Sequence, residues 1–367
     1  MKSPLSLEDN WQILLRMFPT NWRELAKTSK AMVRKFRNFE NEESVMRALL
    51  LHVAGGHSLR ETAIRLKMSN IADVSDVALL KRLQSSENWF KELCLCLLKE
   101  RGVVAAERND KIRMRLVDGT NVKEPGKTGS LWKIHYSLML PNLQCDYFKL
   151  TNTKGVGTGE SFKQFPIQKR DCIVGDRGYS TPQGIAYIES KGAYSLVRVN
   201  TRSLQLFTKN RNQFDLLTKI KTLEEEYGTK EWKVMIKADE CYVPGRICVI
   251  RKSKASVDEA IKKLKRDASK RQTKLEKTTE EFAKYVILFT TLPTEGCPLE
   301  SVLSWYRFRW QIELVFKRLK SLAGLGHLPK HDEVSARAWL YGKLFTGLLV
   351  EKLMHYAKSV SPWGYVE

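Results

Sequence analysis

Four residues in the C-terminal part of the sequence have types and a spacing that suit phosphate chemistry. Tyr306, Arg309, Glu313 and Lys320 follow the pattern Y-x2-R-x3-E-x6-K. If this stretch forms one helix that turns about 100° per residue, all four fall with Lys317 on a stripe roughly 80° wide. A carboxylate among basic groups is the arrangement expected of a metal ligand held beside a phosphate backbone.

The same helix would have a separate apolar face, made of Phe308, Ile312, Val315, Phe316 and Leu319. A helix with these two faces can also be an ordinary surface helix whose charges form i,i+3 and i,i+4 ion pairs. The segment alone does not decide between the two interpretations.

Two more carboxylates end predicted strands. Apolar residues alternate with mainly basic ones over 112–117, and this strand pattern ends in D-G-T at Asp118. A short apolar strand over 172–175 runs into D-R-G-Y at Asp176. Asp118 and Asp176 are 58 residues apart, and Glu313 follows 137 residues later, so only a fold could bring them together.

Each of these aspartates alone is more often a turn residue, so the hypothesis depends on their combination. Three carboxylates suit a hard, oxygen-seeking cation such as Mg²⁺. Two such ions about 4 Å apart can activate a water or a 3′-hydroxyl and stabilise the leaving oxygen of a phosphodiester.

The composition indicates an acidic partner. The chain has 367 residues, 43% of them hydrophobic, and a formal net charge of +22, which most simply implies nucleic acid. An anionic membrane surface is the competing interpretation, but the basic residues are spread along the chain. No uncharged apolar run is as long as a membrane span and no signal peptide is evident, so we expect a cytoplasmic, nucleoid-associated protein with no membrane partner.

Periodicity divides the chain into three predicted parts. Residues 1–107 are predicted to be a helical DNA-binding domain with a helix-turn-helix-like pair between 58 and 83, although a plain helical bundle fits the same pattern. Residues 108–200 and 286–367 are predicted to be the catalytic core, with the order β-β-β-α-β-α-β at its start. Residues 201–285 are predicted to be a β-rich insertion domain with a basic helical stretch. The fold class is therefore mixed α/β, with helices on both faces of the sheet.

The motifs together resemble those of the insertion-sequence-4 family of bacterial DDE transposases. Its signature matches at all four positions of Y-x2-R-x3-E-x6-K, and D-G-T and D-R-G-Y match its other two motifs. The resemblance covers essentially the whole chain. It implies an RNase H-like core with a mainly β insertion domain, in which Asp118, Asp176 and Glu313 bind two Mg²⁺ ions that Mn²⁺ can replace.

The resemblance also implies DNA contacts. Tyr306, Arg309 and Lys320 would contact the DNA backbone near the transposon end. Lys317 and Trp310 would assist them, and Arg177 of D-R-G-Y is expected to contact DNA as well.

Members of this family that form a DNA hairpin stack a flipped base on an aromatic residue of the insertion domain. Tyr285 is the first candidate for this role and Trp232 the second. Tyr285 could equally be a core aromatic residue that begins a strand.

The resulting prediction is a cut-and-paste transposase. It would bind terminal inverted repeats, pair two ends as a homodimer, cleave through a hairpin intermediate and join the 3′-hydroxyl ends to target DNA. Two alternatives remain: a DNA-binding regulator descended from a transposase, and an RNase H-fold nuclease without strand transfer.

Overall fold

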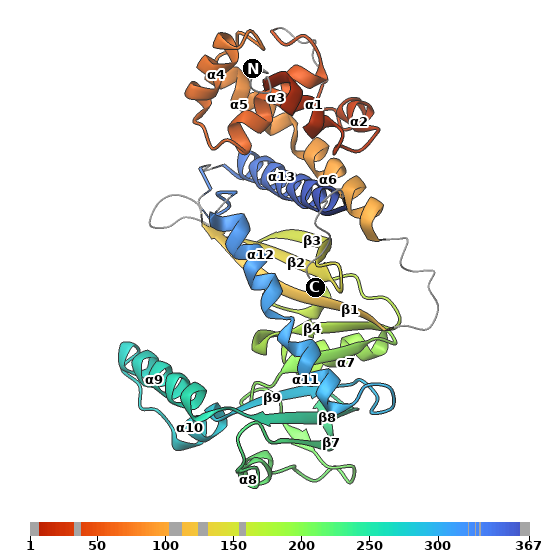
Figure 1. The fold of residues 1–367 in the computed structure, drawn as a ribbon, viewed down its shortest axis with the longest axis vertical. Coiled ribbons are helices and arrows are strands. Elements are labelled where there is room, and N and C mark those ends of the chain that lie inside the picture. The colour runs from red at the N-terminus through yellow and green to blue at the C-terminus, as the bar shows by residue number, and fades with distance from the viewer. Residues whose placement is uncertain are drawn as a thin grey trace.

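The structure is a computed structural model and describes residues 7–32, 38–102, 112–123, 131–153, 159–321, 323–326, 328–329 and 332–359. The molecule is elongated (Figure 1). Helices from the N-terminal part lie at one end, the long helix α13 (Glu333–Ser359) crosses beneath them, and a large sheet extends to the other end. Segments from both ends of the chain therefore pack together above the sheet.

The N-terminal part is helical, as predicted. Its helices are α1 (Leu7–Leu15), α2 (Trp22–Thr28), α3 (Glu42–Val53), α4 (Leu59–Met68), α5 (Asp76–Ser85) and α6 (Glu87–Gly102). The predicted helix pair between 58 and 83 corresponds to α4 and α5. Both helices start at a serine whose side chain accepts a backbone N–H three residues on, Ser58 from Glu61 and Ser75 from Ala78.

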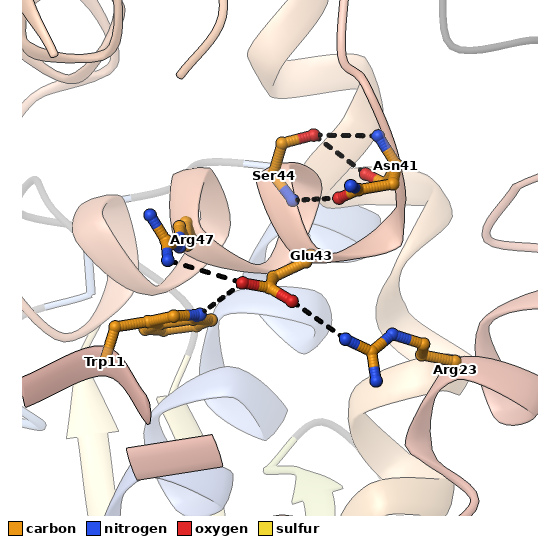
Figure 2. A network of polar contacts seen from close by, with 6 residues as sticks. All are labelled: Trp11, Arg23, Asn41, Glu43, Ser44 and Arg47. Carbon is orange, nitrogen blue, oxygen red and sulfur yellow. Dashed lines mark hydrogen bonds and ion pairs between the residues drawn. The ribbon is translucent and has the colours of Figure 1, made fainter. Parts of the chain in front are cut away.

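A single carboxylate links the first three helices. Glu43 accepts hydrogen bonds from Trp11 Nε1 at 2.8 Å, from Arg23 Nη2 at 2.8 Å and from Arg47 Nη2 at 3.3 Å (Figure 2). Because these residues come from α1, α2 and α3, the contacts hold α1 and α2 against α3.

The sheet has nine strands in the order β3-β2-β1-β4-β5-β9-β8-β7-β6. The strands are β1 (Arg113–Lys123), β2 (Leu131–Met139), β3 (Gln144–Asn152), β4 (Asp171–Gly175), β5 (Tyr194–Arg198), β6 (Leu206–Phe207), β7 (Thr229–Ala238), β8 (Cys241–Arg251) and β9 (Tyr285–Thr290). The first three are antiparallel neighbours, and β1, β4 and β5 run parallel to one another. The mixed α/β class, with three antiparallel strands followed by parallel ones, is as predicted.

Strands from the predicted insertion extend the same sheet. β9 pairs antiparallel with β5 on one side and with β8 on the other, and β7 and β6 follow. After β8 the chain forms α9 (Lys254–Lys270) and α10 (Lys277–Ala283), which project beside the sheet (Figure 1). The domain boundaries near 107, 200 and 285 remain a prediction.

Helices cover both faces of the sheet because neighbouring strand residues point to opposite sides. Leu116 faces a core shared with α12 (Trp310–Ser321), α13 and the N-terminal helices. Val117 faces a second core that includes Ile185 of α7 (Pro182–Ser190) and residues around α8 (Leu216–Lys221). In the part of the chain that is described, no helix is long and apolar enough to cross a membrane.

The first core strand is longer than predicted. The alternating pattern predicted an end at Asp118, but β1 continues through Lys123 because β2 pairs with it along this whole length, from Arg115–Met139 to Lys123–Leu131. Asp118 therefore lies within a strand and not at its end.

A buried ion-pair network should contribute to the stability of the sheet. Asp171 at the start of β4 is fully buried and pairs with Arg113 Nη2 at 2.6 Å and with Arg115 Nη1 at 3.1 Å. Asp171→Ala leaves the buried guanidinium of Arg115 with less compensation, so we expect the free energy of unfolding to fall by about 3 kcal/mol in urea titrations. As a control, Glu100→Ala removes the exposed Glu100–Lys352 pair and should lower it by less than about 1 kcal/mol. Equal losses in the two variants would contradict this role.

Candidate active site

The register of two parallel strands brings Asp118 and Asp176 together. β1 pairs with β4 so that Leu116 lies opposite Val174, and the paired residues are 58 apart in sequence. Asp118 and Asp176 are also 58 apart, so continuing this register by two residues places them side by side where β4 ends. The two sequence motifs therefore meet at one edge of the parallel strands.

Each aspartate is oriented by the backbone of a glycine that follows it. Gly119 N–H donates to Asp118 Oδ1 at 2.7 Å, and Gly178 N–H donates to Asp176 Oδ1 at 2.8 Å. Asp176 is also the N-cap of the short 3-10 helix η3 (Arg177–Tyr179). One oxygen of each carboxylate is thus engaged with the backbone, and the other can serve a ligand.

The predicted helix over residues 306–320 is not continuous. α11 (Leu299–Arg307) ends and α12 begins at Trp310, with a turn at Phe308 and Arg309. The apolar face holds for Ile312, Phe316 and Leu319, which are buried, but Phe308 at the break is 44% exposed. The turn is hidden in the sequence because it reorients the chain while keeping the hydrophobic spacing.

The break still keeps three residues of the motif together. Arg309 Nη2 donates to Glu313 Oε1 at 2.5 Å, and the Arg309 guanidinium lies 6.0 Å from the centre of the Tyr306 ring. Glu313 lies in the first turn of α12, and its side chain is 55% exposed. Lys317 and Lys320 are exposed further along α12, and Trp310 is 50% exposed.

Electrostatics connect this helix pair to the two aspartates. Burial is the main cause that raises the pKa of Asp118 to about 7, and the negative charges of Asp176 and Glu160 add to this rise. The hydrogen bond from Gly119 N–H and the positive charge of Arg309 oppose it. Asp118, Asp176, Glu160 and Arg309 therefore share one neighbourhood. Such crowded negative charge is the environment that a cation would relieve.

The donor set fits a divalent cation only in part. Asp118 and Asp176 supply adjacent carboxylate oxygens, the ligands that Mg²⁺ prefers. Among the described residues, however, no three His, Cys, Asp or Glu side chains are grouped closely enough to hold a metal ion. Glu313 is engaged with Arg309 instead, so it would have to leave this partner to complete the set.

A basic cleft adjoins the aspartates. A cavity of about 780 Å³ lies between Asp176, the end of β5 and the helices α9 and α10. Its basic lining residues are Arg177, Arg198, Arg202, Lys252, Lys263, Arg271 and Arg309. A neighbouring cavity of about 340 Å³ shares Arg198, Lys252 and Arg309 and is also lined by Tyr306 and Trp310.

Three cations at this cleft lie close to one another. Burial, and then the charge of Arg177, lower the pKa of Arg198. Burial, Arg198 and Arg177 lower the pKa of Lys252 to about 8, and Lys252 Nζ donates to the carbonyl of Ala283 at 2.6 Å. No carboxylate of the described chain forms an ion pair with Arg177, Arg198 or Lys252, so an anion entering the cleft would relieve their repulsion.

The two aromatic candidates for base stacking lie in different places. Tyr285 lines the cleft but is only 2% exposed; its hydroxyl donates to the Leu223 carbonyl at 3.5 Å, and the Arg251 guanidinium lies 5.9 Å from the ring centre. Trp232 on β7 is half-buried with its ring 6.3 Å from that of Phe214, and it does not line the cleft. A base could stack on Tyr285 only after its neighbours move.

The sequence did not single out Arg198, Lys252 or Glu160. Arg198 ends a short apolar strand, and Lys252 lies within a long basic run where no residue stands out. Glu160 has no motif of its own. Only the pairing of β5 with β9 and the packing of α9 and α10 show that Arg198 and Lys252 lie beside the aspartates.

The chain is similar to known transposases. A family model described as "Transposase DDE domain" matches residues 147–349. The putative transposase InsL for insertion sequence element IS186A of Escherichia coli (strain K12) is 30% identical over 364 residues, covering 96% of both chains. The transposase for insertion sequence element IS421 of Escherichia coli is 30% identical over 365 residues with the same coverage.

A solved structure described as a piggyBac transposase synaptic complex with hairpin DNA aligns with 97% of this chain and 77% of its own. The sequence identity is 10% and the TM-score 0.45, too low to support a conclusion.

The raised pKa of Asp118 should reduce stability in the absence of metal. Its pKa rises from 3.8 to about 7 on folding, so between these values the folded state binds more protons and loses stability as the pH rises. Asp118→Asn removes this loss, and we expect the variant to gain about 2 kcal/mol over the unmodified chain between pH 5 and pH 7. Urea unfolding in metal-free buffer measures the gain, with the exposed Asp258→Asn as control. A difference that does not change with pH would contradict the burial of this charge.

Proposed function

The chain belongs to the family of DDE transposases, and on that premise we propose that it is a cut-and-paste enzyme that excises an insertion sequence and joins it to new DNA. Transposases of this family act on DNA and use divalent metal ions. The strand register that sets Asp118 beside Asp176, which lines the basic cleft, supports this finer proposal most directly.

Asp118 and Asp176 are the proposed fixed ligands of two Mg²⁺ ions, and Glu313 is the proposed third. Glu313 would exchange its partner Arg309 for the ions, and Arg309 would then be free to contact the scissile phosphate. When bound, the ions supply Lewis-acid activation of a water or 3′-hydroxyl and offset charge on the phosphate. The exposure of Glu313 supports this exchange, because a side chain at the surface can change rotamer without disturbing the core.

The cleft is the proposed path of the DNA strand. Arg177, Arg198 and Lys252 form a cationic group without carboxylate partners among the described residues, which suits a chain of phosphates. Tyr306 and Trp310 line the adjoining cavity and offer ring faces to a sugar or a base. Lys317 and Lys320 extend the basic surface along α12.

The remaining steps rest on the family resemblance. The protein would recognise terminal inverted repeats, pair two ends as a homodimer and open each end through a hairpin, with Tyr285 or Trp232 stacking on a flipped base. The helices α4 and α5 are the proposed reader of the repeat. Joined products would distinguish this function from a nuclease without strand transfer, and cleavage itself would distinguish it from a DNA-binding regulator.

Removing either aspartate should separate binding from cleavage. Asp118→Ala and Asp176→Ala proteins should shift end-containing DNA in gels as the unmodified protein does, because the cationic cleft is intact. With Mg²⁺ or Mn²⁺ they should not nick that DNA. Retained nicking by either variant would sink the assignment, and end binding without cleavage by the unmodified protein would favour the regulator.

The cationic residues should carry the salt dependence of DNA binding. Arg198→Ala and Lys320→Ala should each reduce the slope of log affinity against log salt by about 1, because each removes about one phosphate contact. Lys219→Ala removes an exposed lysine on α8 that does not line the cleft and is the matched control. Titrations at several salt concentrations measure the slopes, and an Arg198→Ala slope equal to that of the control would place the DNA elsewhere.

A further inference from the structure

An ion pair lies next to strand β1, which holds Asp118, and next to the turn that follows Asp176. Lys133 Nζ of β2 lies 2.8 Å from Glu160 Oε1, and the side chains are 11% and 34% exposed. Neither residue belongs to the sequence motifs of the site. Two residues after Glu160, Phe162 is fully buried and its ring lies 5.1 Å from that of Tyr179. This packing fixes the position of the segment that carries Glu160.

Each end of the pair occupies the space that a glycine leaves open. A Cβ atom added to Gly119 would lie 2.7 Å from Cε of Lys133. A Cβ atom added to Gly178 would overlap Oε2 of Glu160 and lie 3.1 Å from Oδ1 of Asp176. The ion pair therefore spans the distance from one glycine to the other and is packed against both.

These two glycines are the ones that orient the aspartates. The N–H of Gly119 holds Oδ1 of Asp118, and the N–H of Gly178 holds Oδ1 of Asp176. The Lys133–Glu160 ion pair, called the strut below, touches both glycines. It thus sets the separation of the two carboxylates through the backbone. Its length is defined by the charge attraction between Lys133 and Glu160.

Lys133 and Asp118 lie on opposite faces of the sheet. In the β1–β2 register, Lys133 lies opposite Asn121 and His135 opposite Gly119, so Lys133 and Gly119 are on the same face of the sheet. Asp118 lies opposite Tyr136 on the other face, where Tyr136 packs against Phe316 of α12. Lys133 therefore lies on the face of the sheet opposite to that of Asp118.

We propose that Lys133 and Glu160 are positioning residues that hold Asp118 and Asp176 at the separation needed to bind a divalent cation. This inference rests on the proposed function of the two aspartates. It requires both partners, because either side chain alone could rotate away from its glycine. The two residues act through the backbone of Gly119 and Gly178 and do not touch DNA.

The alternative is that Glu160 acts only through its negative charge, and removal of Lys133 distinguishes the two. Without the cation, Glu160 would be an unpaired carboxylate near the aspartates and would strengthen the attraction of a metal ion. If the pair is a strut, removal of Lys133 weakens metal binding as much as removal of Glu160. Lys133→Arg, which keeps the cation, should restore most of the affinity.

The experiment measures Mn²⁺ affinity of the full chain without DNA, from the electron paramagnetic resonance signal of free Mn²⁺. Glu160→Gln and Lys133→Met should each weaken Mn²⁺ binding about tenfold, the usual effect of removing a residue that orients a ligand. Glu100→Gln breaks a more exposed 2.7 Å Lys–Glu pair between α6 and α13 and should leave Mn²⁺ affinity unchanged.

Unchanged Mn²⁺ affinity in Glu160→Gln, or tighter Mn²⁺ binding in Lys133→Met, would overturn the proposed positioning role of the ion pair. So would a general loss of folding, seen as a fall in melting temperature well beyond that of Glu100→Gln together with loss of end binding. If Asp118→Ala leaves Mn²⁺ affinity unchanged, the proposed metal site fails instead, so the two failures are distinguishable.

Discussion

The parallel register of β1 and β4 is the constraint on which the rest of the site depends. It aligns Leu116 with Val174 and, two residues later, brings Asp118 beside Asp176. Burial raises the pKa of Asp118 to about 7, and repulsion from the neighbouring carboxylate of Asp176 adds to the shift. The fold tolerates this because the backbone amides of Gly119 and Gly178 bind one oxygen of each, and because the sheet is stabilised by extensive apolar burial on both faces.

Around this negative centre the chain places unusually many cations. Arg177, Arg198 and Lys252 come from three different segments, and none of them forms an ion pair with a carboxylate of the described residues, although Asp176 and Asp267 also line the cleft. The arrangement is unfavourable for the free protein and favourable once a polyanion enters, because like charges at close range lower one another's pKa. Under the proposed function, metal ions would relieve the repulsion among the acidic groups, and DNA phosphates would relieve the repulsion among the basic groups.

The turn between α11 and α12 sets the position of Glu313, the third proposed metal ligand. Tyr306 ends one helix and Glu313 begins the next, with Arg309 at the break and paired with Glu313. A straight helix would have fixed the angle between these side chains. The break allows Tyr306 to line the cleft while Glu313 stays at the surface, paired with a cation that DNA could also bind. Under the proposed function, metal ions would compete with Arg309 for Glu313, and DNA would compete with Glu313 for Arg309.

The sequence alone was enough to predict the strands of the core, the acidic motifs, the basic character and the family, because these depend on local alternation, short spacing and composition. It predicted the wrong end for β1, since a strand's length is set by its partner β2, and it predicted one helix where a turn preserves the hydrophobic period. It could not indicate Arg198, Lys252 or the Lys133–Glu160 pair, whose importance comes from neighbours distant in sequence. The types of the chemical groups are thus a property of the sequence. Their separation, their pKa values and their partners were decided by the tertiary structure, because all three depend on long-range pairing and burial.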